Sequence, residues 1–191
     1  AFWLLLEKQM QQPLPITQPQ FLTVDKGSSI SSFAQTLVNQ GWVDSRFWLR
    51  AYARLHPDKV QIKAGTYQVP TNSNLHNVVE LVASGKEHQY QLTFVEGTSF
   101  KQWLALLKKQ QQLTHSLASL TVKEISKRLG IEQANPEGWF FPDTYAFTQG
   151  TDEFTLLQRA YRAMQTLLSQ HWQQRAVGLP YETPYQALIM A

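Results

Sequence analysis

Residues 137–145 read Glu137-Gly138-Trp139-Phe140-Phe141-Pro142-Asp143-Thr144-Tyr145, a stretch with neither a helical period nor the alternation of a half-buried strand. Its glycine permits a left-handed or closely approached backbone, and its proline fixes φ and removes a hydrogen-bond donor. Its aromatic side chains offer flat faces that can stack on sugar rings or bases. The stretch is therefore predicted either to line a binding site or to fill a core as an aromatic turn.

The composition around this stretch is that of a globular protein. The chain has 191 residues, of which 43% are hydrophobic, so one large or two small domains are expected. The formal charge is +3, and because no run of five or more like charges occurs, no nucleic-acid partner is expected. Cysteine is absent, which excludes disulfides, thiolate zinc sites and cysteine nucleophiles. The histidines lack a metal-ligand spacing such as HExxH, so no metal site is expected: His56, His76, His88, His115 and His171.

Residues 1–20 are predicted to be the end of an N-terminal membrane anchor followed by a linker. The apolar run Phe2-Trp3-Leu4-Leu5-Leu6 is too short to span a bilayer, which needs about 20 residues. It fits the last turns of a longer membrane helix with Trp3 at the interface, or else an ordinary hydrophobic N-terminus. Residues 9–20 carry three prolines and five glutamines without a period, which predicts an extended linker.

Residues 21–86 have the pattern of a small module with two helices between two strands. Apolar residues and turn signals predict strands at 21–24 and 65–69, with helices from residue 30 to Gly41 and at 45–55. This order resembles a LysM-like βααβ module, a fold that commonly binds N-acetylglucosamine polymers. A glycan ligand is therefore one expectation for this part of the chain.

The chain also contains an internal repeat. Residues 22–33 align with residues 92–103, each as a strand, a glycine turn and a helix capped by a hydroxyl group, and residues 67–75 form a weaker third copy. The alternative is that any turn from strand to helix selects glycine and serine. On this pattern Glu96, just before the glycine of the second copy, is expected to be a structural turn residue.

Further helices are expected at about 100–110, at 122–129 and from residue 152 to a point before Gly178. Thr183-Pro184 begins a final apolar helix without a cap at its end, so the chain is predicted to be a fragment. The long helix is expected to bury one apolar face, made of Phe154, Leu157, Tyr161, Met164, Leu168 and Trp172.

Four motifs occur in a fixed order: Ala64-Gly65-Thr66-Tyr67, Ala83-Ser84-Gly85-Lys86, Val95-Glu96-Gly97 and residues 137–145. With these motifs the chain resembles the endolytic murein transglycosylase family, MltG or YceG-like, from about residue 21 onward. The resemblance implies an α+β fold, with a LysM-like subdomain at 21–86 and the first, mixed α/β part of a catalytic domain at 87–191, incomplete at its C-terminus. It also implies a single-pass protein of the bacterial inner membrane whose domain faces the periplasm or cell wall.

The implied activity is cleavage of MurNAc-GlcNAc bonds in nascent peptidoglycan strands, leaving 1,6-anhydro-MurNAc ends. Peptidoglycan and proteins of the wall-synthesis machinery are the implied partners. In the family, the catalytic glutamate lies in a motif close to Ser-Ile-Ile-Glu-Lys-Glu, directly after a segment like residues 188–191. No residue of this chain inherits that role, because the expected glutamate lies just beyond Ala191. No cofactor is expected, and no lysine here has a setting that suits a pyridoxal-phosphate lyase.

Residues 137–145 are expected to form the wall of the sugar-binding pocket and to raise the pKa of the acid by excluding water. Asp143 either contacts sugar hydroxyls or bonds its own backbone beside Thr144, and Glu137 is a weaker candidate for a substitute acid. The alternative function is a non-catalytic glycan-binding module. The expected wall residues are Glu137, Gly138, Trp139, Phe140, Phe141, Pro142, Asp143 and Tyr145.

Overall fold

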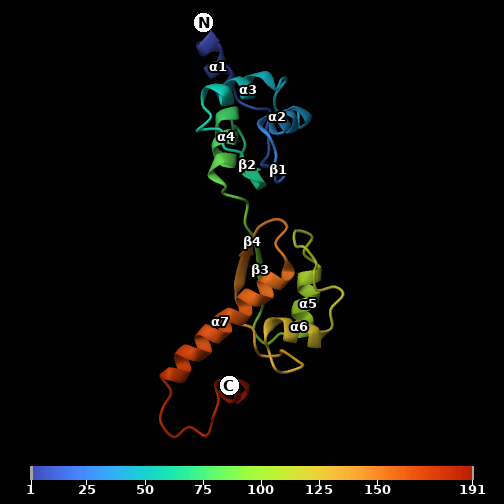
Figure 1. Ribbon diagram of the computed structural model, residues 1–191, viewed down its shortest axis with the longest axis vertical. Helices are drawn as coiled ribbons and strands as arrows, with labels where there is room; N and C mark the ends of the chain where they lie inside the picture. Colours follow the sequence, from blue (N-terminus) through green and yellow to red (C-terminus); the bar gives the residue numbers. More distant parts are fainter. Residues whose placement is uncertain (1, 191) are drawn as a thin grey trace. The chain divides into compact units, whose positions relative to one another are not determined.

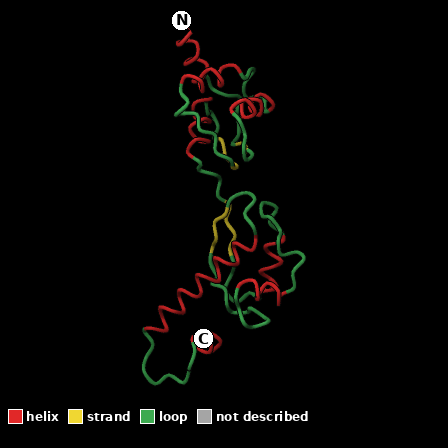
Figure 2. Tube along the Cα trace, viewed as in Figure 1, coloured by secondary structure: helices red, strands yellow, loops and turns green. Residues whose placement is uncertain are grey.

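The computed structural model describes residues 2–190, and their fold is α+β as the sequence predicts (Figure 1). The chain divides into two compact units, Ala1–His88 and Gln89–Ala191. Each unit contains one antiparallel pair of strands with helices packed around it (Figure 2). The two units have separate hydrophobic cores, so each is described by itself.

The first unit contains the predicted βααβ order, preceded and followed by a helix. In β1 and β2 the residue pairs are antiparallel, with Leu22 opposite Tyr67 and Thr23 opposite Thr66. Both Leu22 and Tyr67 are fully buried, so the sheet presents one face to the core. The elements are α1 (Phe2–Gln11), β1 (Gln20–Val24), α2 (Ile30–Asn39), α3 (Phe47–Leu55), β2 (Gly65–Val69) and α4 (Leu75–Ser84).

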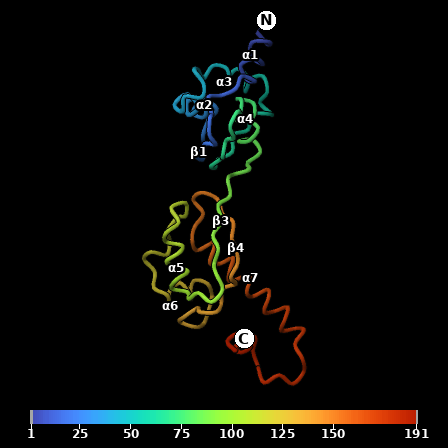
Figure 3. Tube along the Cα trace, turned by 180° about the vertical axis from the view of Figure 1, so that it is seen from behind, coloured from blue at the N-terminus to red at the C-terminus, as the bar shows by residue number. Residues whose placement is uncertain are grey.

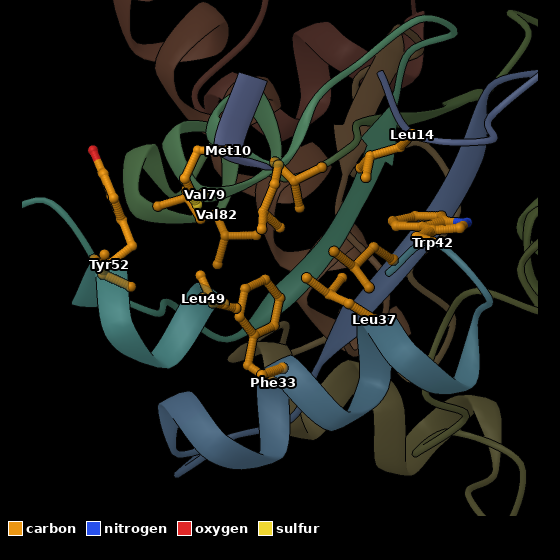
Figure 4. Close-up of a cluster of buried hydrophobic side chains, with 14 of the residues drawn as sticks. Met10, Leu14, Phe33, Leu37, Trp42, Leu49, Tyr52, Val79 and Val82 are labelled. Atoms are coloured by element: carbon orange, nitrogen blue, oxygen red, sulfur yellow. The ribbon is translucent and has the colours of Figure 1, made fainter. Parts of the chain in front are cut away.

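Local capping fixes the starts of α2 and α4. The Ser29 side chain accepts a hydrogen bond from the Ser32 N–H at 3.1 Å and begins α2. Asn74 and Asn77 form a reciprocal capping box at the start of α4, and Gly85 ends that helix with φ at 69°. The side chains that these helices turn inward gather into one cluster, in which Phe33, Leu37, Leu49, Val79 and Val82 are labelled (Figure 4).

The segment predicted to be a linker is instead part of the first core. Leu14 and Ile16 are buried, and the Leu14 N–H donates to the Ser73 carbonyl at 2.9 Å. Upstream, Leu6 and Met10 of α1 are buried in the same cluster. The prolines break regular structure, but apolar residues at alternate positions still pack against the unit. Within residues 2–190, every helix is too short or too polar to cross a lipid bilayer.

The second unit is built on β3 and β4, whose residue pairs include Leu92 opposite Tyr145 and Thr93 opposite Thr144. The long helix α7 passes the sheet and continues beyond it, after which the chain turns back to α8 (Figure 3). The elements are β3 (Tyr90–Thr93), α5 (Phe100–Lys108), α6 (Val122–Leu129), β4 (Thr144–Phe147), α7 (Glu153–Gln173) and α8 (Pro184–Met190).

The buried face of α7 differs from the predicted one. Leu156 and Ala160 are fully buried, whereas the predicted Leu168 and Trp172 are only half-buried. No described residue of α7 after Met164 is buried, because this half of the helix lies past the sheet. Helical spacing predicted the apolar face correctly only in part, for the first half of α7. It could not predict how far along the helix burial extends, because that depends on where the sheet ends.

The internal repeat has a clear structural counterpart. In both copies a strand leads to a glycine with positive φ, Gly27 at 78° and Gly97 at 76°, and then to a serine that caps the next helix. One threonine pair in each sheet also corresponds, since the Thr93 and Thr144 hydroxyls lie 2.7 Å apart and those of Thr23 and Thr66 lie 3.3 Å apart. Each unit is therefore organised around the same strand, turn and helix.

Candidate functional site

The second unit contains a cavity of about 690 Å³ beside the aromatic stretch. One wall is the turn at 95–99 with the first turn of α5, and a second is the segment 137–142 without Trp139. Met164 and Leu167 of α7 and Leu188 of α8 complete the lining. The cavity therefore joins the second glycine turn of the repeat to the stretch that the sequence singled out.

The turn before α5 is held by a dense set of local hydrogen bonds. The Thr98 hydroxyl donates to the Val95 carbonyl at 2.5 Å and accepts from the Trp103 indole N–H at 2.8 Å. Ser99 and Gln102 form a capping box at the start of α5. Positive φ at Gly97 completes the turn, and this conformation is strained for residues with a side chain. This wall is consequently well defined before any ligand arrives.

Glu137 connects the aromatic stretch to this wall. Both of its carboxylate oxygens lie 3.0 Å from the Phe100 backbone nitrogen, at the start of α5. The N–H groups of a first helical turn have no partner within the helix, and negative charge is favourable there. Glu137 thus lines the cavity while serving as a cap for a helix distant in sequence. That role accounts for its presence without requiring it to act as an acid.

Four of the remaining predicted wall residues line the cavity: Gly138, Phe140, Phe141 and Pro142. Phe140 is 6% exposed and stacks on Phe100 with ring centres 5.0 Å apart and planes 9° apart. The Phe141 N–H donates to the carbonyl of Ala160 in α7 at 3.0 Å. These contacts place the stretch between α5 and α7, with an apolar surface toward the cavity.

Trp139 does not line the cavity but packs behind it. Its ring stacks on Tyr185 of α8, with centres 4.7 Å apart and planes 5° apart, and meets Tyr161 of α7 edge-on at 5.9 Å. Its indole nitrogen is buried and has no hydrogen-bond partner among the described residues. Trp139 thereby supports α8, the helix whose Leu188 lines the cavity.

Asp143 and Tyr145 also lie outside the cavity lining. The Asp143 carboxylate accepts a hydrogen bond from the Thr144 N–H at 2.7 Å, which is the local backbone interaction predicted as its alternative. The Tyr145 hydroxyl donates to the Phe141 carbonyl at 2.7 Å. Burial, reinforced by the Asp143 charge and opposed by that of Arg159, raises the pKa of Tyr145 to about 12.

Tyr67 in the first unit makes the same hydrogen bond as Tyr145, which shows that this bond is part of the fold rather than of the site. The Tyr67 hydroxyl donates to the carbonyl of Lys63, four residues earlier, at 2.8 Å, just as Tyr145 donates to that of Phe141. Burial likewise raises the pKa of Tyr67. Because the same interaction recurs in a unit without residues 137–142, it stabilises the strand and turn rather than a site peculiar to the second unit.

Several cavity residues were not foreseen from the sequence, chiefly the turn 95–99 and the side chains from α7 and α8. The repeat marked the turn as a structural feature, but nothing in the sequence paired it with Glu137. Glu96 is exposed at the cavity, and no hydrogen bond or ion pair is found for its side chain within residues 2–190. The lining holds two carboxylates and no Lys, Arg or His, which suits a ligand rich in hydroxyl and amide groups better than an anion.

The described residues contain no group of three or more metal-ligating side chains close enough to hold an ion.

Residues 22–191 match the sequence profile of the YceG-like family, and the chain therefore belongs to that family. A search of curated proteins found no match. A 2.6 Å crystal structure of a yceG-like protein from Listeria monocytogenes is similar over 83% of this chain and 58% of its own, with 18% identity and a TM-score of 0.35.

Proposed function

We propose that this chain forms part of a peptidoglycan lytic transglycosylase and that the cavity of the second unit binds the glycan strand. Its YceG-like family membership and the apolar, aromatic wall of the cavity support this function. The observation that carries the proposal is that Leu188 of α8 lines the same cavity as the 137–142 segment. In a longer chain, residues that follow α8 would start beside the bound glycan.

The chemistry requires one carboxyl group that first protonates the glycosidic oxygen. As a carboxylate, the same group then assists attack of the muramoyl 6-hydroxyl on the anomeric carbon, which gives the 1,6-anhydro end. Water is not the nucleophile, so the second carboxylate that glycoside hydrolases place across the sugar is not needed. The role of the acid is assigned to the glutamate expected just after Ala191, and the apolar wall would raise its pKa toward the working pH.

The test compares three proteins on purified sacculi: the chain of 191 residues, a chain extended through the family motif, and the extended chain with the motif glutamate changed to glutamine. Mass spectrometry of the soluble products detects anhydro-muropeptides. Only the extended chain with its glutamate is expected to release them. Release by the 191-residue chain would place the acid within it, and a lack of release by all three would reject the transglycosylase function.

A second candidate is a glycan-binding role without catalysis, which the βααβ order and antiparallel sheet of the first unit favour. Sedimentation with insoluble peptidoglycan tests it, since a binding module should be retained even when no bond is cut.

The proposed setting for either function is the periplasmic or cell-wall side of the bacterial inner membrane. Wall-synthesis proteins are the proposed partners, and neither function calls for a metal or cofactor.

A further inference from the structure

Helix α3 in the first unit has an outward face that combines apolar and basic side chains. Phe47, Arg50, Ala51, Arg54 and Leu55 follow the spacing of one helical face, and all are exposed or half-buried. The opposite face, with Leu49, Tyr52 and Ala53, is buried in the core. Helix α3 is thus amphipathic, but its solvent side is itself half apolar.

The first turn of α1 extends this surface. The Phe2 ring lies 6.4 Å from Phe47 and 6.5 Å from Trp48, measured between ring centres, and Phe47 lies 5.1 Å from Trp48. Phe2 and Phe47 also line a hollow of about 590 Å³ with Arg50 and Arg54. We call this surface the α1–α3 face; its large apolar members are Phe2 (49% exposed), Phe47 (54%) and Leu55 (49%).

The arginines of the α1–α3 face lack acidic partners. Within residues 2–190, no ion pair or side-chain hydrogen bond is found for Arg50 or Arg54, and both are exposed. The pKa of Tyr52, on the buried side of α3, is raised mainly by burial and then by the charges of Glu7, Glu80 and Asp58. The face therefore presents arginines without ion pairs among apolar side chains.

We propose that the α1–α3 face docks on the surface of an anionic phospholipid bilayer. Aromatic rings favour the boundary between headgroups and acyl chains, and arginine can bury its stem while its guanidinium group pairs with lipid phosphates. Basic residues near such a surface add electrostatic attraction. A second copy of the chain fits the face less well, because a two-fold contact would bring the same arginines together. This inference is independent of any catalytic activity.

The experiment is flotation of the 191-residue chain with vesicles of phosphatidylcholine alone or with one quarter phosphatidylglycerol. Binding is expected only to the anionic vesicles and should weaken at 0.5 M NaCl. The variant Arg50→Glu/Arg54→Glu should reduce the bound-to-free ratio on the order of tenfold or more. Its matched control is Lys123→Glu/Lys127→Glu, which makes the same charge change at the same spacing on the exposed side of α6 and should bind like the parent.

An apolar variant, Phe47→Ser/Leu55→Ser, separates insertion from simple charge attraction and is also expected to reduce binding. Circular dichroism checks that each variant is folded. We expect all of them to fold, because the changed side chains are exposed. Equal binding to both vesicle types, or equal loss in the α6 control, would overturn the proposal. Sedimentation equilibrium provides a further check, since a dimer that Phe47→Ser/Leu55→Ser dissociates would assign the face to a second copy instead.

Discussion

At the scale of single residues, the aromatic stretch separates into members that face the cavity and members that hold the framework. Phe140 and Phe141 are in the lining, whereas Trp139 supports α8 and Tyr145 closes a hydrogen bond within the strand and its preceding turn. Adjacent residues therefore differ in role, because they meet different partners: Trp139 stacks on Tyr185, whereas Phe140 stacks on Phe100.

Glu137 is predicted to contribute to stability through its contact with the start of α5. Changing Glu137→Ala removes the acceptor of the Phe100 N–H and should lower the free energy of unfolding by about 1 kcal/mol. Glu137→Gln retains an acceptor and should cost less. Urea denaturation followed by circular dichroism measures both, with the exposed Glu132→Ala as control. An equal loss in the glutamine and alanine variants would argue against capping.

Tyr145 predicts a dependence of stability on alkaline pH. Its pKa is raised to about 12, so the folded state holds the phenolic proton more tightly than the unfolded state. The resulting stabilisation is complete below about pH 10 and is lost as the pH rises toward 12. In Tyr145→Phe the loss of stability between pH 9 and 11 should be smaller than in the parent, as measured by urea denaturation. Tyr181→Phe is the control, and an unchanged slope for Tyr145→Phe would contradict the assignment.

At the scale of elements, the loop 113–120 is attached to the first turn of α7. The Glu153 side chain is 5% exposed; one oxygen accepts the Leu117 N–H at 2.7 Å, and the other lies 2.9 Å from His115 Nδ1. Alongside it, the Ser116 hydroxyl donates to Asp152 at 2.5 Å. The loop is thus held by the same helix terminus that Asp152 caps.

Glu153→Ala is predicted to release this loop. The buried Leu117 N–H would lose its acceptor, so the free energy of unfolding should fall by about 1–3 kcal/mol. Hydrogen exchange at 113–120 should rise more than in α5. The exposed Glu80→Ala, in the first unit, is the control and should leave exchange in this loop unchanged. Exchange that stays slow in Glu153→Ala would show that other contacts hold the loop.

At the scale of the whole molecule, two repeats of one strand, turn and helix have separate cores. Leu37 and Leu157 are both fully buried, the first in the Ala1–His88 unit and the second in the Gln89–Ala191 unit. The glycine turn is shared, but only the second unit has the 137–142 segment beside it. This difference explains why the cavity beside the second glycine turn has a wall from the 137–142 segment that the first unit lacks.

Calorimetry should therefore resolve the two units. Leu37→Ala and Leu157→Ala are each expected to cost about 2–5 kcal/mol, because each empties a fully buried position. Each substitution should lower the unfolding temperature of its own unit and leave the other transition in place. Leu4→Ala, at a side chain 73% exposed, is the control. A single transition shifted equally by both core variants would show that the units unfold together.

The sequence by itself determined the position of most helices and strands, the glycine turns, the serine caps and the family, because these depend on short-range spacing and local hydrogen bonds. It placed the βααβ order correctly and pointed to residues 137–145. It did not show that Leu14 and Ile16 enter a core, since prolines beside them suggested an extended chain. Nor did it indicate how far along α7 burial extends.

Only the tertiary structure decided which residues of the aromatic stretch face the cavity. That choice depends on contacts between distant segments: Glu137 with Phe100, Phe141 with Ala160, and Trp139 with Tyr185. The sequence shows that aromatic side chains of this kind could line a site. Which way each side chain points is set by the residues that it contacts in the folded protein. Residues 137–145 therefore form a cavity wall and also connect α5, α7 and α8. The physical reason is that this one short segment contacts all three helices.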